Sequence, residues 1–266
     1  MTQVISRDGT PIVYERAGSG PAVILVGGGL DDGSENAPLV PELAEDFTIV
    51  NYSRRGRGKS GDTSPYALER EFEDLAALIA AVGGSAHLFG ASSGGALALE
   101  AAAAGLPIGR IAVYDVPYSI GDDAVQTWQD YLTRLRAALG DGRREEALSL
   151  FMRLAGSSDD DIAAASASPM WPPLLDLAPT LAYDAVCLGD GPPPVTRLAT
   201  ITQPTLVATG AGLASHMAGL RVDFFGQAAD VITSHVPGAE RLVIDVYEHV
   251  VDPKVLAPVL TRFFLA

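Results

Sequence analysis

A serine flanked by glycines is the first group in this chain that could do chemistry. The segment Gly90-Ala91-Ser92-Ser93-Gly94 matches the pattern G-x-S-x-G and lies between an apolar stretch, 85–89, and an alanine-rich stretch, 91–105. A strand that turns sharply into a helix needs glycine beside the turn, because the backbone is pinched there and a larger side chain would clash. The motif therefore predicts a nucleophile elbow, with the Ser92 hydroxyl as the attacking group.

A serine hydroxyl is a weak nucleophile at neutral pH, so it needs a base within hydrogen-bonding reach. Of the four histidines, only His249 lies between the last expected strand and the last expected helix, in a loop that returns to the carboxyl edge of a sheet. His87 lies inside the strand before the elbow and is interpreted as a core histidine with satisfied hydrogen bonds. His216 and His235 flank an expected helix. His249 is therefore the predicted base.

The elements that must position these groups alternate between strands and helices. Eight short apolar segments are expected to be strands, and the last six are apolar throughout, as in a sheet covered on both faces. These segments are 3–6, 11–17, 22–26, 47–52, 86–89, 110–114, 205–209 and 241–246. Expected helices are 39–45, 66–82, 91–105, 214–229 and 253–264, with Asp252 as a cap. The pattern predicts an α/β fold with a mostly parallel sheet and helices on both faces.

The alternation lapses for about ninety residues after the sixth expected strand. Helical spacing of apolar side chains continues there but is broken by prolines and serines. We therefore expect a core formed by residues 1–117 and 201–266, with residues 118–200 inserted as a helical lid. Bulky apolar side chains in the lid and beside the core's glycine loop are candidates for lining an apolar substrate pocket. They are Leu30, Trp128, Met152, Trp171 and Tyr183.

Composition excludes several classes of partner. The chain has 33 acidic and 18 basic residues and a formal net charge of −15, which repels nucleic acid and anionic membrane surfaces. No segment approaches the run of about 18 apolar residues that spans a membrane, and the start lacks a secretory signal, so a cytoplasmic location is expected. The single Cys187 can form neither an internal disulfide nor a thiolate metal cluster and is expected to be a buried apolar residue. No metal or cofactor is expected.

The basic segment 54–61 superficially matches two phosphate-binding motifs. Its glycines have G-x-G-x-x-G spacing, but Pro65 follows and no helix opens directly on the glycines, as a dinucleotide loop requires. Its Gly58-Lys59-Ser60 ending resembles a P-loop, but Ser53 occupies the position of the required first glycine. Neither phosphate-binding interpretation is favoured.

Three segments together resemble the α/β-hydrolase superfamily, especially its lidded serine esterases, lactonases and perhydrolases. They are 52–61, 89–95 and Glu248-His249. The resemblance implies an α/β-hydrolase fold in which 55–61 is a structural connection after a strand. It also matches the glycine loop 25–30 to the family's oxyanion loop, although Gly27 replaces the histidine often found there.

By the same resemblance, the backbone amides of Gly29 and Ser93 would hold the negative oxygen of a tetrahedral intermediate. Alternatively, the glycine loop is only a tight turn with a structural role. Asp31 and Asp32, beside it, are interpreted as facing solvent, because negative charge near a developing oxyanion would oppose catalysis.

The acid that would orient the histidine departs from the common family pattern. Most members carry an Asp or Glu after the seventh strand, but 210–215 contains no carboxylate. Asp115 ends the strand 110–114, 23 residues after Ser92, and would reach the same sheet edge. Many haloalkane dehalogenases resemble this arrangement, so Asp115 is the predicted acid. The alternative is that Asp115 caps a turn before Pro117.

These residues predict a hydrolase that acts on a small apolar carboxylic ester or lactone through a Ser-His-Asp acyl-enzyme, with that substrate and water as its partners. Two alternatives stay open. The missing usual acid also fits non-hydrolytic chemistry, such as carbon–carbon cleavage, lyase or cyclase reactions in which His249 acts directly. The absence of the usual acid also fits a ligand-binding protein that has lost catalysis.

Overall fold

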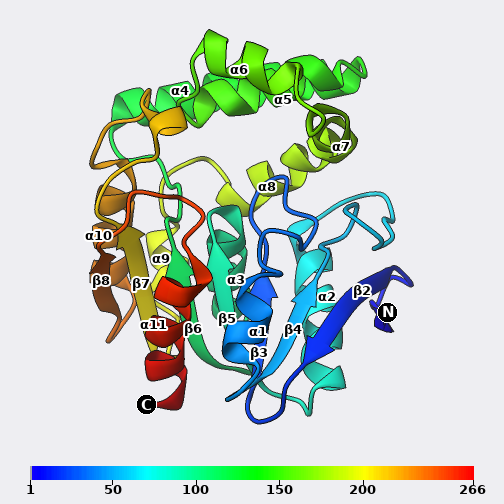
Figure 1. The fold of residues 1–266 in the computed structure, drawn as a ribbon, viewed down its shortest axis with the longest axis vertical. Coiled ribbons are helices and arrows are strands. Elements are labelled where there is room, and N and C mark those ends of the chain that lie inside the picture. Colours follow the sequence, from blue (N-terminus) through cyan, green and yellow to red (C-terminus); the bar gives the residue numbers. More distant parts are fainter. Residues whose placement is uncertain (1) are drawn as a thin grey trace.

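The centre of the computed structural model, which describes residues 2–266, is an eight-stranded sheet with the strand order β1-β2-β4-β3-β5-β6-β7-β8 (Figure 1). β2 pairs antiparallel with β1 and β4, and the other five pairings are parallel. The strands are β1 (Thr2–Ile5), β2 (Pro11–Ala17), β3 (Ala22–Val26), β4 (Thr48–Tyr52), β5 (Ala86–Ala91), β6 (Ile108–Tyr114), β7 (Thr205–Gly210) and β8 (Glu240–Ile244). All eight predicted strands are confirmed, with bounds that differ by at most two residues at either end.

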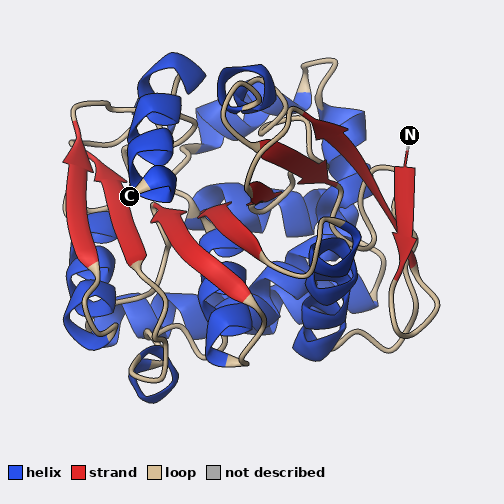
Figure 2. Ribbon diagram, turned by 90° about the horizontal axis from the view of Figure 1, so that it is seen from below, coloured by secondary structure: helices blue, strands red, loops and turns tan. Residues whose placement is uncertain are grey.

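Helices cover both faces of the sheet (Figure 2). α1 (Leu39–Leu43) and α11 (Pro253–Leu265) pack on one face, and α2 (Leu68–Ala81), α3 (Ser93–Ala103) and α10 (Phe224–His235) pack on the other. Successive residues of a strand point to opposite faces, so Ile24 and Val23 of β3 join different apolar cores. This two-sided burial explains why the central strands are apolar throughout.

Six α-helices and a short 3₁₀ helix, Ala178–Thr180, lie in the chain between β6 and β7, and we call them the insertion. The α-helices are α4 (Asp122–Gly140), α5 (Arg144–Leu154), α6 (Asp159–Ser166), α7 (Trp171–Leu177), α8 (Leu181–Leu188) and α9 (Val195–Leu198). Figure 1 shows α4, α5 and α6 as a layer at the top of the molecule, with α7 and α8 between that layer and the sheet. The spacing of Trp128, Tyr131, Leu132 and Leu135 buries one face of α4.

One predicted helix is shorter and later than expected. The stretch 214–229 was expected to be helical, but α10 begins only at Phe224, after a short 3₁₀ turn at Ser215–Met217. The intervening chain is bound to the insertion instead, because the Gly219 amide donates to the Gly156 carbonyl at 2.9 Å. The Asp252 cap is confirmed: its Oδ1 accepts from the Lys254 amide at 2.9 Å. No helix within residues 2–266 has both the length and the apolar character needed to cross a membrane.

Candidate active site

Ser92 lies between β5 and α3 in a strained backbone conformation. Its φ of 54° and ψ of −130° are uncommon for a residue with a side chain, and its amide donates to the Tyr114 carbonyl at 2.9 Å. A Cβ added to Gly90 would lie 2.4 Å from the Gly94 carbonyl oxygen, and one added to Gly94 would lie 2.3 Å from that of Val26. Only glycine fits at either position, so the G-x-S-x-G pattern forms a tight elbow at the carboxyl end of β5.

His249 and Asp115 meet at the same edge of the sheet. His249 lies in the loop between β8 and α11, and its Nδ1 is 3.1 Å from Oδ2 of Asp115, which follows β6. Oδ1 of Asp115 accepts from the Gly210 amide at 3.3 Å, and its carboxylate is buried. This contact with the ring fits the orienting role predicted for Asp115. The alternative, a local turn cap, is not favoured, because no hydrogen bond within residues 2–266 joins the carboxylate to an amide of residues 116–118.

Aromatic contacts hold the histidine loop in place. The Phe225 ring stacks on the His249 ring with centroids 5.2 Å apart and an interplanar angle of 18°. The Tyr114 hydroxyl donates to the Glu248 carbonyl at 2.8 Å and so ties this loop to the end of β6. The imidazole plane is therefore set by a carboxylate on one nitrogen and by a ring on one face.

Ser92 and His249 line one cavity of about 590 Å³, a volume typical of small-molecule sites. The residues Gly28 and Gly29 of the glycine loop also line it, beside the elbow: a Cβ on Gly28 would lie 3.1 Å from Cβ of Ser92. Most of the remaining wall is apolar, and the insertion and α10 supply it. These side chains include Trp128, Phe151, Met152, Leu154, Phe224 and Phe225.

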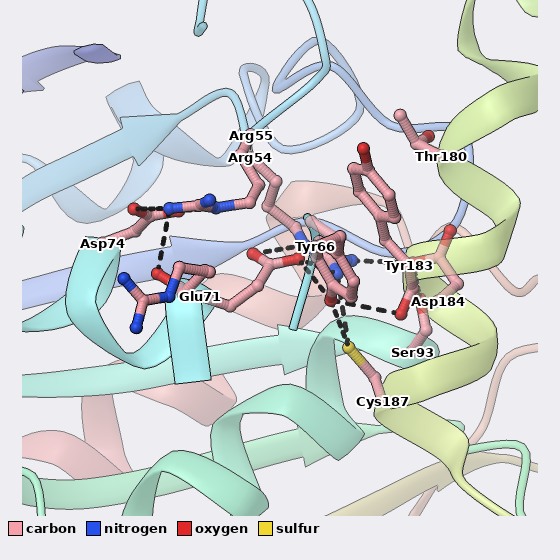
Figure 3. Close-up of polar contacts among 12 residues, drawn as sticks. Arg54, Arg55, Tyr66, Glu71, Asp74, Ser93, Thr180, Tyr183, Asp184 and Cys187 are labelled. Atoms are coloured by element: carbon pink, nitrogen blue, oxygen red, sulfur yellow. Dashed lines mark hydrogen bonds and ion pairs between the residues drawn. The ribbon is translucent and has the colours of Figure 1, made fainter. Parts of the chain in front are cut away.

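Three arginines of the segment after β4 are fully buried. Arg54 binds Glu71 of α2 at 2.6 Å and Asp184 of α8 at 2.7 Å. We call these arginines and the carboxylates that bind them the arginine cluster, and Figure 3 shows Asp184 of the insertion pointing toward it. Arg57 binds the same Asp184 carboxylate at 2.7 Å. A buried guanidinium is stable only when carboxylates or carbonyls take its donors, which explains why the segment could not be a free phosphate loop.

The third arginine belongs to a separate pair in the same cluster. Both Arg55–Asp74 hydrogen bonds are 2.8 Å long, and Asp8 at 2.9 Å takes a further donor of Arg55. Glu71 and Asp74 are three residues apart on α2 and therefore share a face, a signal that the sequence contains. Asp184 carried no such signal and was missed.

A sequence model described as the alpha/beta hydrolase family matches residues 22–252. The chain belongs to this alpha/beta hydrolase family. An alpha/beta hydrolase from Sphaerobacter thermophilus DSM 20745 is 45% identical over 99% of this chain and 100% of that one, with a TM-score of 0.87. The uncharacterized hydrolase YraK of Bacillus subtilis (strain 168) is 34% identical over 96 residues. That match spans only 35% of either protein. The enol-lactonase from Burkholderia xenovorans LB400, at 19% identity and a TM-score of 0.70 over both whole chains, shares the fold.

Within this hydrolase, the cavity includes two of the five predicted pocket side chains, Trp128 and Met152. The other three lie outside its lining and correct the expectation. Trp171 is buried in a small apolar cluster inside the insertion, and Leu30 packs against that cluster. Tyr183 stacks on Tyr66, with ring centroids 3.8 Å apart. Helical spacing groups bulky residues on one face, but it does not say whether that face meets a cavity or another helix.

Two further expectations about this hydrolase were wrong. Asp31 is buried rather than solvent-facing, because it accepts from the amides of Gly33 at 2.8 Å and Glu35 at 3.0 Å in the turn after the glycine loop. Burial raises the pKa of Asp31. His87 was expected to have satisfied hydrogen bonds, but its buried Nδ1 has no hydrogen-bond partner among residues 2–266. Cys187 is buried as expected, and burial raises the pKa of its thiol to about 12.

The glycine loop predicted to supply an oxyanion amide lies beside the elbow, along the same cavity. Gly29 lines the cavity with Ser92, and Ser93 begins α3, whose first amides are free of helical partners. Within residues 2–266, no group of three or more His, Cys, Asp or Glu side chains is arranged to hold a metal ion.

Proposed function

We propose that this hydrolase cleaves small apolar carboxylic esters or lactones through a covalent acyl-enzyme on Ser92. The Asp115–His249 contact beside the cavity that Ser92 lines is the observation that carries the proposal. In the first step, Nε2 of His249 takes the proton of the Ser92 hydroxyl while Oγ attacks the substrate carbonyl carbon. The Asp115 carboxylate stabilises the imidazolium that results.

The remaining steps return the enzyme to its starting state. The amides of Gly29 and Ser93 donate to the negative oxygen of the tetrahedral intermediate, each contributing roughly 10²–10³ in rate. The intermediate expels the alkoxide, which takes the proton from His249. Water then attacks the acyl-enzyme with His249 as base, and the carboxylic acid leaves as Ser92 regains its proton.

The walls of the cavity support the substrate class. Trp128, Phe151 and Phe224 offer apolar surface, and a net charge of −15 opposes the approach of strongly anionic substrates. We further propose that residues 118–200 act as a lid that limits water around the acyl-enzyme. An enol-lactonase and an esterase from Exiguobacterium antarcticum share this fold, which is compatible with such substrates.

Labelling with a fluorophosphonate tests the proposal. We expect rapid phosphonylation, mapped by peptide mass to Ser92, because the probe needs a serine activated by a base. The His249→Ala variant should react at least about 100-fold more slowly, the lower limit of general-base catalysis. His235→Ala is the matched control, because this exposed histidine lies on α10 outside the cavity lining. Folded wild-type protein that stays unlabelled would overturn the acyl-enzyme and favour non-hydrolytic or ligand-binding roles.

A further inference from the structure

Asp184 of the insertion connects to both parts of the expected oxyanion site. Its Oδ1 accepts from Arg54 Nη1 at 2.7 Å, from Arg57 Nη2 at 2.7 Å and from the Ser93 hydroxyl at 2.8 Å. Oδ2 accepts a second bond from Arg57 at 2.8 Å. Figure 3 shows this carboxylate between Ser93 and the Arg54 side chain. One carboxylate thus accepts four hydrogen bonds from two separate segments, the arginine segment 54–57 and the elbow at Ser93.

The same two guanidiniums hold the glycine loop. Arg54 Nη1 donates to the Gly27 carbonyl at 3.2 Å, and Arg57 Nη1 donates to the carbonyls of Gly28 and Asp31. In a trans peptide, the carbonyl of one residue and the amide of the next point in opposite directions. With the Gly28 carbonyl held by Arg57, the Gly29 amide must point away from the arginine cluster.

This restraint matters because the φ and ψ angles of glycine are less restricted than those of other residues. Gly27, Gly28 and Gly29 have no Cβ to limit their backbone, so an unrestrained loop would sample orientations in which the Gly29 amide misses the oxyanion. The second amide belongs to Ser93, whose hydroxyl is tied to Asp184 at 2.8 Å. Burial alone would raise the pKa of Asp184, but Arg57 and Arg54 lower it, so the group stays a carboxylate.

We propose that Asp184 is a positioning residue for the oxyanion hole: it fixes the Gly29 amide through Arg57 and the Ser93 amide through the Ser93 hydroxyl. Through Asp184 of α8, the insertion therefore positions the oxyanion hole as well as forming part of the cavity wall. The inference rests on the function proposed for Ser92, since the acyl-transfer reaction proposed there needs both amides.

The Asp184→Asn variant tests this role, because it keeps the shape of the side chain and removes its charge. On a p-nitrophenyl ester we expect kcat to fall at least about 100-fold, the scale of one lost oxyanion donor, with KM changed less than threefold. Affinity for a trifluoromethyl ketone, which forms a tetrahedral oxyanion on Ser92, should fall by a similar factor. A purely structural role would lower stability without this separation of kcat from KM.

Asp74→Asn is the matched control. It also breaks a buried arginine–carboxylate pair, but Arg55 and Asp74 contact neither the glycine loop nor Ser93 in the hydrogen bonds described. We expect its kcat to stay within about twofold of wild type. Equal loss of kcat in both variants would overturn the positioning role of Asp184.

Two further readouts keep the outcome clear. Ser93→Ala removes only the hydroxyl arm and should lower kcat about tenfold, the scale of one hydrogen bond, so it carries the test if Asp184→Asn does not fold. In protein labelled with ¹⁵N-glycine, the Gly29 amide resonance should shift or broaden in Asp184→Asn. An unchanged Gly29 resonance would overturn this inference alone, whereas wild-type protein with neither turnover nor labelling would overturn the proposed function.

Discussion

The two carboxylates beside the site are held in contrasting ways. Asp115 makes one 3.1 Å contact with His249, whose side chain is 20% exposed, and accepts one backbone amide. Asp184 accepts from Arg54, Arg57 and Ser93 at 2.7–2.8 Å, and all of these groups are buried. His249, the proposed base, is therefore held by one carboxylate and one stacked ring and lines the cavity, whereas Asp184, the proposed positioning residue, is held by several buried donors.

Backbone strain follows the same division. Among residues 2–266, the non-glycine residues with positive φ are Leu30, Ser92 and Asp115, and each follows a parallel strand at the carboxyl edge of the sheet. In the arginine segment, Gly56 and Gly58 take the positive φ values instead. Strain of this kind persists only where the surroundings over-determine it and is common at catalytic sites. The arginine segment avoids such strain, because glycine occupies its positions of positive φ.

The largest test of this contrast is Asp115→Asn. It should lower kcat about 10⁴-fold, because the neutral amide no longer stabilises the imidazolium or its tautomer. The midpoint of urea unfolding should barely change, since the side chain contributes few contacts. Steady-state kinetics and urea titration measure the two effects, and a loss of kcat below about fivefold would remove Asp115 from the mechanism.

The second test should change stability strongly and turnover little. Asp74→Asn should destabilise the fold by about 3–5 kcal/mol, because it leaves the buried Arg55 charge without its bidentate partner. Its turnover should stay close to that of wild type at a temperature where the protein is folded. Urea unfolding followed by circular dichroism gives the free energy. A change under about 1 kcal/mol would mean that solvent or Asp8 satisfies Arg55.

A smaller effect concerns the ring on His249. Phe225→Leu keeps an apolar side chain but loses the stacked face, so the imidazole plane is less well set. Aromatic contacts of this kind are worth about 0.5–1.5 kcal/mol, so we expect kcat/KM to fall roughly 2- to 12-fold. Kinetics at saturating and limiting substrate measure it. Unchanged kcat/KM would show that Asp115 alone orients the ring.

The smallest expected effect is on the pH dependence of stability and concerns His87, which lies outside the candidate active site and the arginine cluster. Burial, assisted by Arg110, lowers the pKa of His87 in the folded state, so the unfolded chain binds this proton more readily. The stabilising contribution is present above about pH 6.5, the unfolded value, and is lost as the pH falls from there through the folded pKa. His87→Gln should therefore lose less stability than wild type between pH 8 and pH 5. Parallel losses in thermal or urea unfolding would contradict this.

The local features of this protein follow from residues near one another in the chain. The elbow at Ser92, the eight strands and the Asp252 cap all depend on residues close together in the chain, where glycine geometry, apolar periodicity and capping chemistry act directly. The position of His249 and Asp115 after parallel strands also predicted their meeting, because parallel strands bring their carboxyl ends to one edge.

The partner surface of each helix or strand depends instead on how distant parts of the chain pack together. Asp184 is 130 residues from Arg54 along the chain, so no spacing rule could pair them. Trp171 and Tyr183 have the same apolar character as Trp128, yet only Trp128 lines the cavity. Periodicity shows which side chains share a face, but burial, ion pairing and cavity lining depend on the surface that the fold brings against it.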